Sequence, residues 1–128
     1  HIGTAEEKDA IAIMHEAIDH GMTFFDNAWD YHDGHSEDVM GTALATDGRR
    51  QKVILMTKCC GRDYKTARQH LDDSLRRLKT DRSDLWQVHE NHWSVGQYSA
   101  AETVKVTDCV LGLASIWIVN VEHPKRLY

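Results

Sequence analysis

The sequence has 128 residues, of which 41% are hydrophobic and 27% charged, and its formal net charge is −5. This length fits one globular domain, and the acidic balance provides no basic surface of the kind that binds nucleic acid or an anionic membrane. No run approaches the ~18 consecutive apolar residues of a membrane-spanning helix. Three cysteines, two of them adjacent at Cys59 and Cys60, are not the pattern of a disulfide framework, so we expect a reducing, cytoplasmic location.

The N-terminal part of the chain predicts one helix, one strand and a polar loop. Thr4 and Glu7 have the spacing of a capping box, and an apolar stripe at helical spacing follows them. The short run Thr23–Asp26 (TFFD) then predicts a strand that ends in a carboxylate. The polar segment Asn27–His35 is expected to form the loop that leads to the next helix.

The middle of the chain predicts two further helix–strand pairs. Ser36 is expected to cap a second helix, and the run Val53–Lys58 (VILMTK) predicts a strand buried on both faces, as in a parallel sheet. The polar segment Arg62–Thr66 opens a third helix, and Asp84–His89 (DLWQVH) is the strand after it. The residues expected on the buried sides of these two helices are Val39, Met40, Ala43 and Leu44, and then Ala67, Leu71, Ser74, Leu75 and Leu78.

The last part predicts one more helix and one more strand. Ser99 and Glu102 form a second capping box, and Ser115–Val121 (SIWIVNV) is a fourth apolar run, which contains Asn120. The strands recur about every 30 residues, the length of a strand–helix–strand unit. This alternation predicts an α/β fold with a parallel sheet, and four such units make about half of an eight-stranded (β/α) barrel of the TIM type. We therefore expect residues 1–128 to form a single, partial (β/α)-barrel domain.

Ionisable residues stand at the ends of three successive predicted strands. Asp26 ends the first strand, Lys58 the second and His89 the third. In a (β/α) barrel the carboxyl ends of all strands face the same mouth, where catalytic groups are placed. We therefore predict that these three side chains converge there together with Tyr31 from the adjoining loop.

This set of side chains suits the reduction of a carbonyl group. A tyrosine phenol is a weak acid with a pKa of about 10, and an adjacent ammonium group stabilises the phenolate that proton donation leaves behind. A carboxylate beside the lysine aims the ammonium, and a neutral imidazole can hold the same oxygen that receives the proton. No strong nucleophile with an activating base is evident, and a hydride must come from a nicotinamide or a flavin, because no side chain supplies one.

Three segments resemble the aldo-keto reductase family. The string GMTFFDNAWDYHDGHSEDVMGTAL (Gly21–Leu44) resembles its signature, which reads roughly G-x-x-x-F/I-D-T-A-x-x-Y-x-x-G-x-S-E-x-x-x-G. VILMTK and SLRRLKTDRSDLWQVH (Ser74–His89) resemble the next two blocks, and ETVKVTDCVLGLASIWIVN (Glu102–Asn120) resembles the following helix and strand more weakly. The resemblance implies a (β/α)₈ barrel that reduces aldehydes and ketones to alcohols with NADPH.

The resemblance also implies roles for individual residues. Asp26, Tyr31, Lys58 and His89 match the catalytic tetrad of the family, with Tyr31 as the proton donor, Tyr31 and His89 facing the substrate, and Asp26 also facing the cofactor. Asn120 matches an asparagine that holds the nicotinamide carboxamide, although it is equally suited to a turn at the end of a strand.

The departures from the family lie around the cofactor site. Val119 stands where the family usually has serine, and Trp117 stands where it has glycine. The last strands of the family barrel, with the loops that grip the cofactor phosphate and adenine, have no counterpart in this sequence, so the C-terminal half of the barrel is expected to be absent.

Two further features of the sequence have more than one interpretation. Trp29 lies between Asp26 and Tyr31, and it either lines a substrate pocket or covers the rim of the barrel. The remaining histidines and the paired cysteines invite a metal site, but their spacings match no recognised zinc pattern, so we expect no metal. The residues considered for that site were His32, His35, Cys59, Cys60, His89 and His92.

Two functions remain open from the sequence. The first is an oxidoreductase acting on a small carbonyl compound, either as part of a longer enzyme or completed by a partner. The second is a non-catalytic relic or binding module that retains the signature without the cofactor half. Because four parallel strands leave two unpaired edges, we also expect the isolated chain to self-associate through them.

Overall fold

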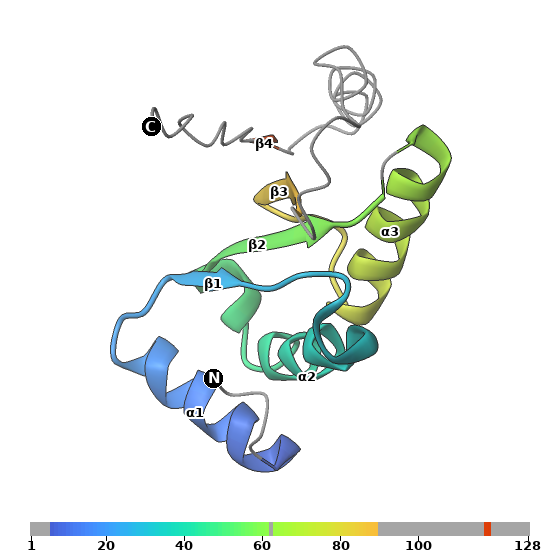
Figure 1. Ribbon diagram of the computed structural model, residues 1–128. Helices are drawn as coiled ribbons and strands as arrows, with labels where there is room; N and C mark the ends of the chain where they lie inside the picture. The colour runs from blue at the N-terminus through green and yellow to red at the C-terminus, as the bar shows by residue number, and fades with distance from the viewer. Residues whose placement is uncertain (1–5, 62, 90–116, 119–128) are drawn as a thin grey trace, which may run out of the picture.

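The computed structural model describes residues 6–61, 63–89 and 117–118 (Figure 1). The predicted helix after Ser99, and Asn120 with it, lie outside the described residues. The elements in chain order are α1 (Glu7–Asp19), β1 (Phe24–Asp26), α2 (His35–Leu44), β2 (Ile54–Cys59), α3 (Tyr64–Arg77), β3 (Leu85–Val88) and β4 (Trp117–Ile118). Two short 3₁₀ segments, Tyr31–Gly34 and Arg49–Lys52, lie just before α2 and β2.

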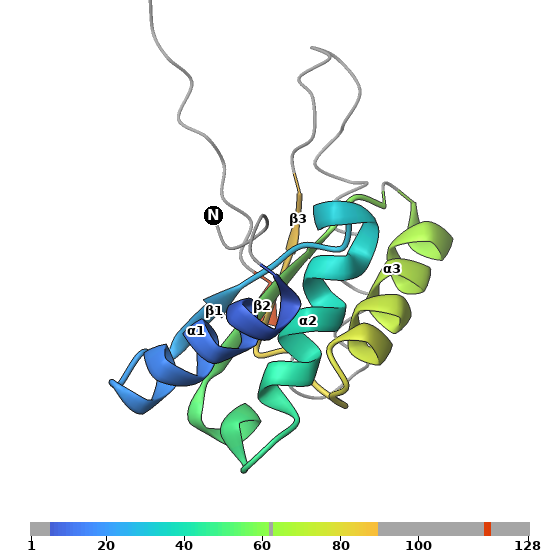
Figure 2. The ribbon, with the colours of Figure 1, turned by 90° about the horizontal axis from the view of Figure 1, so that it is seen from below.

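The four strands form one parallel sheet in the order β1-β2-β3-β4, so each strand pairs with the next one along the chain. The register places Met56 of β2 opposite both Asp26 of β1 and Leu85 of β3. All three helices lie on the same side of β1 and β2 (Figures 1 and 2). This sequential parallel order, with the helices as connections on one face, confirms the predicted partial (β/α) barrel.

The hydrophobic core lies between the helices and one face of the sheet. Phe25 of β1 and Leu55 of β2 are neighbours in the register and point toward the helices, where Met14, Leu44 and Leu78 pack against them. All five side chains are at most 6% exposed. The core therefore fixes the sheet against α1 and α2 and leaves the other face of the sheet to face away from them.

The opposite face of the sheet is open at its N-terminal end, so the prediction that the strand Val53–Lys58 is buried on both faces is wrong there. Phe24 and Ile54 are opposite each other in the register and are 46% and 47% exposed. β2 is therefore not buried on both faces along its whole length. The reason is that the helices of the described residues cover one side, and side chains alternate between the two sides along a strand.

Two helices begin at other residues than the capping patterns predict. The N-cap of α1 is Glu6, so the capping box at Thr4, which lies outside the described residues, does not start this helix. The N-cap of α2 is Gly34 rather than Ser36, because the chain enters this helix from a left-handed turn. At α3, by contrast, the Asp63 side chain accepts a hydrogen bond from the backbone N–H of Thr66, as an N-cap does.

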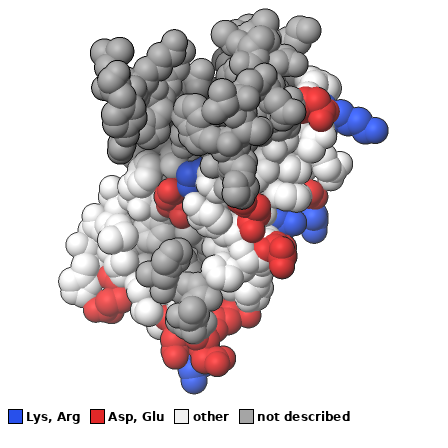
Figure 3. Space-filling model, viewed as in Figure 1, with Lys and Arg blue, Asp and Glu red and all other residues white. Residues whose placement is uncertain are grey.

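Charges are mixed on the surface of the described residues. On the face drawn in Figure 3, acidic side chains of these residues gather toward the lower end, and the basic side chains are scattered without forming a continuous patch. Within the same residues, no helix has both the length and the apolar composition needed to cross a bilayer.

Candidate active site

Lys58 and Asp26 form an ion pair where β1 and β2 end. The Nζ atom of Lys58 donates to Oδ1 of Asp26 at 2.5 Å and to the backbone carbonyl oxygen of Asn27 at 2.9 Å. The Lys58 side chain is only 10% exposed, whereas that of Asp26 is 43% exposed. Removing an ammonium group from water is costly unless other oxygens replace the water, so these two oxygens hold the ammonium in place.

Tyr31 and His89 complete the group. The Nζ atom of Lys58 lies 5.3 Å from the centroid of the Tyr31 ring. The rings of Tyr31 and His89 meet edge to face, with their centroids 5.5 Å apart and their planes at 78°. The structure thus brings Asp26, Lys58, Tyr31 and His89 together in one chain of contacts, and Tyr31 keeps 39% of its surface exposed.

Backbone hydrogen bonds continue the sheet beyond the strands and carry these side chains to the same end. The N–H of Asn27 donates to Met56 and that of Trp29 to Lys58, each at 2.9 Å. On the other side of β2, the N–H of His89 donates to the carbonyl oxygen of Cys59 at 2.7 Å. The loop after β1 and the residue after β3 are therefore both anchored to the last residues of β2.

The turn after Tyr31 requires a glycine. Gly34 has φ +91°, and a Cβ atom there would lie 2.3 Å from Cζ of Arg77. The left-handed backbone strains any larger residue here, and a Cβ atom would also displace the Arg77 guanidinium. Arg77 in turn donates from Nη1 to the carbonyl oxygen of Trp29 at 2.9 Å, so α3 supports the loop that carries Tyr31.

Glu37 is fully buried beneath this loop, which the sequence analysis did not anticipate. Its Oε1 atom accepts from the Thr57 hydroxyl at 2.6 Å, and its Oε2 atom lies 3.4 Å from Nη1 of Arg77. Burial raises the pKa of the Glu37 carboxyl, and the hydrogen bond from Thr57 and the guanidinium of Arg77 partly offset that rise. The one sequence signal was that Glu37 belongs to the Ser-Glu pair of the signature string, where no role was assigned to it.

Trp29 makes its ring contacts with α3 rather than with the four residues above. Its ring stacks on His70, with centroids 3.6 Å apart, and its Nε1–H donates to Asp73 at 3.4 Å. These contacts hold Trp29 against α3. Both readings of Trp29, the lining of a substrate pocket and the cover of the rim, stay predictions.

Asp30 is a second residue at the site that no sequence pattern indicated. Its Oδ1 atom lies 3.1 Å from Nδ1 of His89 and so helps to orient the imidazole ring. Only its position gave a signal, because Asp30 immediately precedes Tyr31 in the same loop. Among the residues that could meet a cofactor, Asp26 is half-exposed at the mouth, and Asn120 lies outside the described residues.

Comparison with known proteins finds relatives in the family that the sequence motifs resemble. The model of the aldo/keto reductase family matches residues 1–108. The aldo-keto reductase YhdN of Bacillus subtilis is 37% identical over 94% of this chain, and the methylglyoxal reductase YeaE of Escherichia coli is 34% identical over 88%. This chain covers 39% and 38% of those two proteins, so it spans about two fifths of their length.

Solved structures agree with this relationship. The holo form of an aldo-keto reductase from Bacillus halodurans matches 88% of this chain with a TM-score of 0.77 and 30% identity. An aldo/keto reductase from Klebsiella pneumoniae in complex with NADP and acetate matches 93% with a TM-score of 0.77 and 29% identity. This chain covers 41% and 42% of those two structures. The chain belongs to the aldo/keto reductase family.

Proposed function

We propose that this chain carries the proton-donating part of the active site of an NADPH-dependent oxidoreductase that reduces aldehydes or ketones to alcohols. The observation that carries the proposal is the continuous contact from Asp26 through Lys58 and Tyr31 to His89 at the carboxyl ends of the strands. Family membership supports it, as does the NADP bound to the Klebsiella pneumoniae relative.

Each of the four residues has a defined role in the proposed proton transfer. The Tyr31 hydroxyl donates a proton to the carbonyl oxygen as negative charge develops there, and the Lys58 ammonium stabilises the phenolate that remains. Asp26 holds Lys58 in place through their ion pair. His89 donates a hydrogen bond that keeps the carbonyl oxygen beside Tyr31, and Asp30 limits rotation of its ring.

The nicotinamide cofactor would supply the hydride, and the residues at the mouth fit such a group. The Asp26 carboxylate uses one oxygen for Lys58 and is still 43% exposed, so it can accept a hydrogen bond from a sugar hydroxyl. Asn120 is the residue proposed to hold the carboxamide. The phosphate and adenine would be held by residues that follow this chain in a complete barrel.

The proposed substrate is a small carbonyl compound that reaches Tyr31 and His89 from the open mouth, with Trp29 at its rim. The proposed location is the cytoplasm, where Cys59 and Cys60 remain reduced. The alternative of a non-catalytic binding module predicts the same fold but no turnover in any complete barrel that contains this chain.

The test is a barrel chimera, in which this chain replaces the corresponding N-terminal part of YhdN. Tyr31→Phe keeps the ring and removes only the acid, so we expect turnover of an aldehyde with NADPH to fall by about 100-fold or more while NADPH affinity changes little. Tyr64→Phe, at a tyrosine that is 56% exposed on α3, is the matched control and should leave turnover unchanged. Full activity of the Tyr31 variant would show that another group donates the proton.

A further inference from the structure

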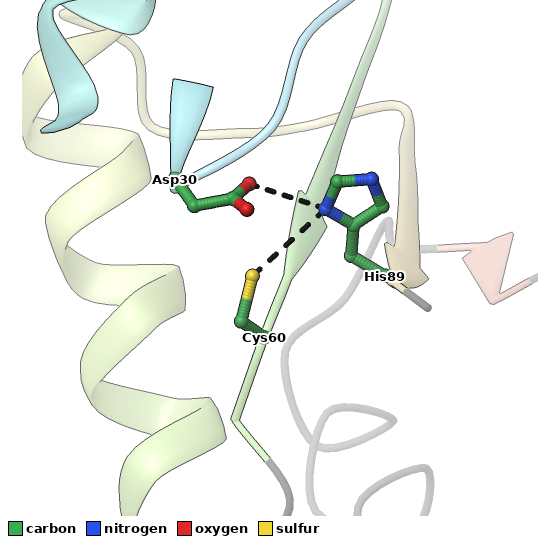
Figure 4. A group of neighbouring side chains, drawn as sticks. All are labelled: Asp30, Cys60 and His89. Atoms are coloured by element: carbon green, nitrogen blue, oxygen red, sulfur yellow. Dashed lines mark hydrogen bonds and ion pairs between the residues drawn. The ribbon is translucent and has the colours of Figure 1, made fainter. Parts of the chain in front are cut away.

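Beside the proposed catalytic group, three side chains of different chemistry converge from three different segments. Asp30 comes from the loop after β1, Cys60 follows the end of β2, and His89 follows the end of β3 (Figure 4). One oxygen, one sulfur and one nitrogen atom of these residues all lie within 4.8 Å of one another. We propose that Asp30, Cys60 and His89 form a binding site for a divalent cation of the zinc class.

The distances suit a tetrahedral cation. Nδ1 of His89 is 3.1 Å from Oδ1 of Asp30 and 3.9 Å from Sγ of Cys60. In a tetrahedral zinc site, with bonds of about 2.0–2.3 Å, the ligand atoms lie about 3.3–3.6 Å apart. Shifts of a few tenths of an ångström bring the two pairs that include His89 to that spacing, and the ligand atoms of Asp30 and Cys60 already lie within 4.8 Å of each other.

The donor set selects the metal. Thiolate and imidazole ligands favour zinc and related transition metals over magnesium or calcium, which prefer oxygen atoms only. Three protein ligands leave a fourth position for water, as in many open zinc sites. The single Nδ1 atom of His89 can form a full hydrogen bond with only one of Asp30 and Cys60 at a time. A cation, by contrast, would be bound by all three side chains together.

Sequence spacing could not reveal this site, because its ligands are separated by 59 positions between Asp30 and His89 and by 29 between Cys60 and His89. Only the parallel pairing of the strands brings them to one end of the sheet. The expectation of no metal, drawn from the absence of recognised zinc spacings, therefore does not apply to ligands that the fold assembles.

Binding has a defined proton balance. The cation replaces the proton of the Cys60 thiol, which is released, and its bond to Nδ1 requires the remaining imidazole proton to be on Nε2. Nε2 lies on the far side of the ring from Asp30 and Cys60 (Figure 4). Cation binding itself does not depend on the proposed function. Its consequence does: an occupied site would fix His89 as a donor through Nε2 toward the carbonyl oxygen.

The test uses the whole 128-residue chain under reducing conditions and Co²⁺ as a spectroscopic probe, followed by competition with Zn²⁺. We expect one Co²⁺ per chain, with near-ultraviolet thiolate charge-transfer absorption and the visible bands of tetrahedral cobalt, which Zn²⁺ abolishes. Cys60→Ser should remove the charge-transfer band and lower Zn²⁺ affinity by more than about 100-fold, because it removes a ligand rather than a supporting group.

Two further variants keep the result interpretable. Asp30→Asn, at a partly exposed position, should retain the thiolate band and lower Zn²⁺ affinity by about 10-fold or more. Cys109→Ser removes the third thiol of the chain and should leave both readouts unchanged. Octahedral cobalt without thiolate absorption, or unchanged affinity in Cys60→Ser, would overturn the proposal, and neither readout depends on turnover.

Discussion

At the scale of single residues, His70 links the rim of the site to α3. Its Nδ1 atom accepts a hydrogen bond from the backbone N–H of Cys60 at 3.3 Å, and its ring stacks on Trp29. This hydrogen bond requires an unprotonated Nδ1. Burial lowers the pKa of His70, and the nearby Arg77 guanidinium lowers it further, against the opposing effect of Asp73.

His70 should make folding sensitive to pH. Because its pKa in the folded protein lies below the ordinary value of 6.5, the unfolded chain takes up the proton first as the pH falls. The stability contributed by neutral His70 is therefore complete above pH 6.5 and is lost progressively below it. Urea unfolding should show that stability falls less between pH 7.5 and pH 5 in His70→Asn than in the wild-type protein. The amide oxygen of the introduced side chain can still accept the hydrogen bond from the backbone N–H of Cys60, and it does not titrate. Equal losses in both proteins would assign the pH dependence to other groups.

At the scale of secondary-structure elements, one buried network joins α2, β2 and α3. Glu37 of α2, Thr57 of β2 and Arg77 of α3 meet beneath the loop that carries Tyr31. Gly41 lets α2 and α3 approach closely, since a Cβ atom there would lie 2.2 Å from the carbonyl oxygen of Arg77. The position of Tyr31 therefore depends on how these helices pack.

Removing Glu37 should be severe. Glu37→Ala leaves the Thr57 hydroxyl and part of the Arg77 guanidinium without their buried partner, and we expect the free energy of unfolding to fall by about 3–5 kcal/mol. Glu37→Gln, which can still accept from Thr57, should cost less. Asp72→Ala, which breaks the exposed ion pair with Arg68, should cost less than about 1 kcal/mol. Chemical denaturation compares the three variants, and similar losses for Glu37→Ala and Asp72→Ala would contradict a structural role of the network.

Features that depend on local interactions could be predicted from the sequence, whereas features that depend on tertiary contacts could not. Periodic apolar patterns predicted the described strands and helices, because each pattern reflects burial on one face of a local element. The matched strand ends predicted which side chains meet, because parallel pairing carries their carboxyl ends to one edge. The burial of Glu37, the left-handed entry at Gly34 and the Cys60–His89 approach depend on tertiary contacts, which no local pattern encodes.

At the scale of the whole molecule, one face of the sheet is open at its N-terminal end within the part of the chain that the structure describes. Phe24 and Ile54 on that face are about half-exposed, and both belong to strands whose opposite face is packed against helices. In a closed barrel this face would be the interior. Phe24 and Ile54 therefore give the described part of the chain an apolar surface that a second body can cover.

We predict that the isolated chain self-associates through this surface and binds NADPH weakly or not at all. Ile54→Glu should shift the mass measured by light scattering toward the monomer, because it places a charge on the uncovered face. Ile13→Glu changes an isoleucine on α1 that is 50% exposed, close to the 47% of Ile54, and should have no such effect. A monodisperse wild-type monomer that binds NADPH with micromolar affinity, followed by cofactor fluorescence, would be inconsistent with both parts of this prediction.

The central claim is that Tyr31 and Lys58 act as one proton-donating unit, and a double-mutant cycle in the barrel chimera tests it most directly. The measurement is kcat/KM for aldehyde reduction by NADPH in the parent chimera, Tyr31→Phe, Lys58→Met and the double variant. Each single change should reduce kcat/KM by about 100-fold or more, and the double variant should lose little beyond the larger single loss, because both residues serve the same proton transfer. Losses that multiply across the cycle, or a folded chimera in which neither substitution lowers kcat/KM, would contradict the account.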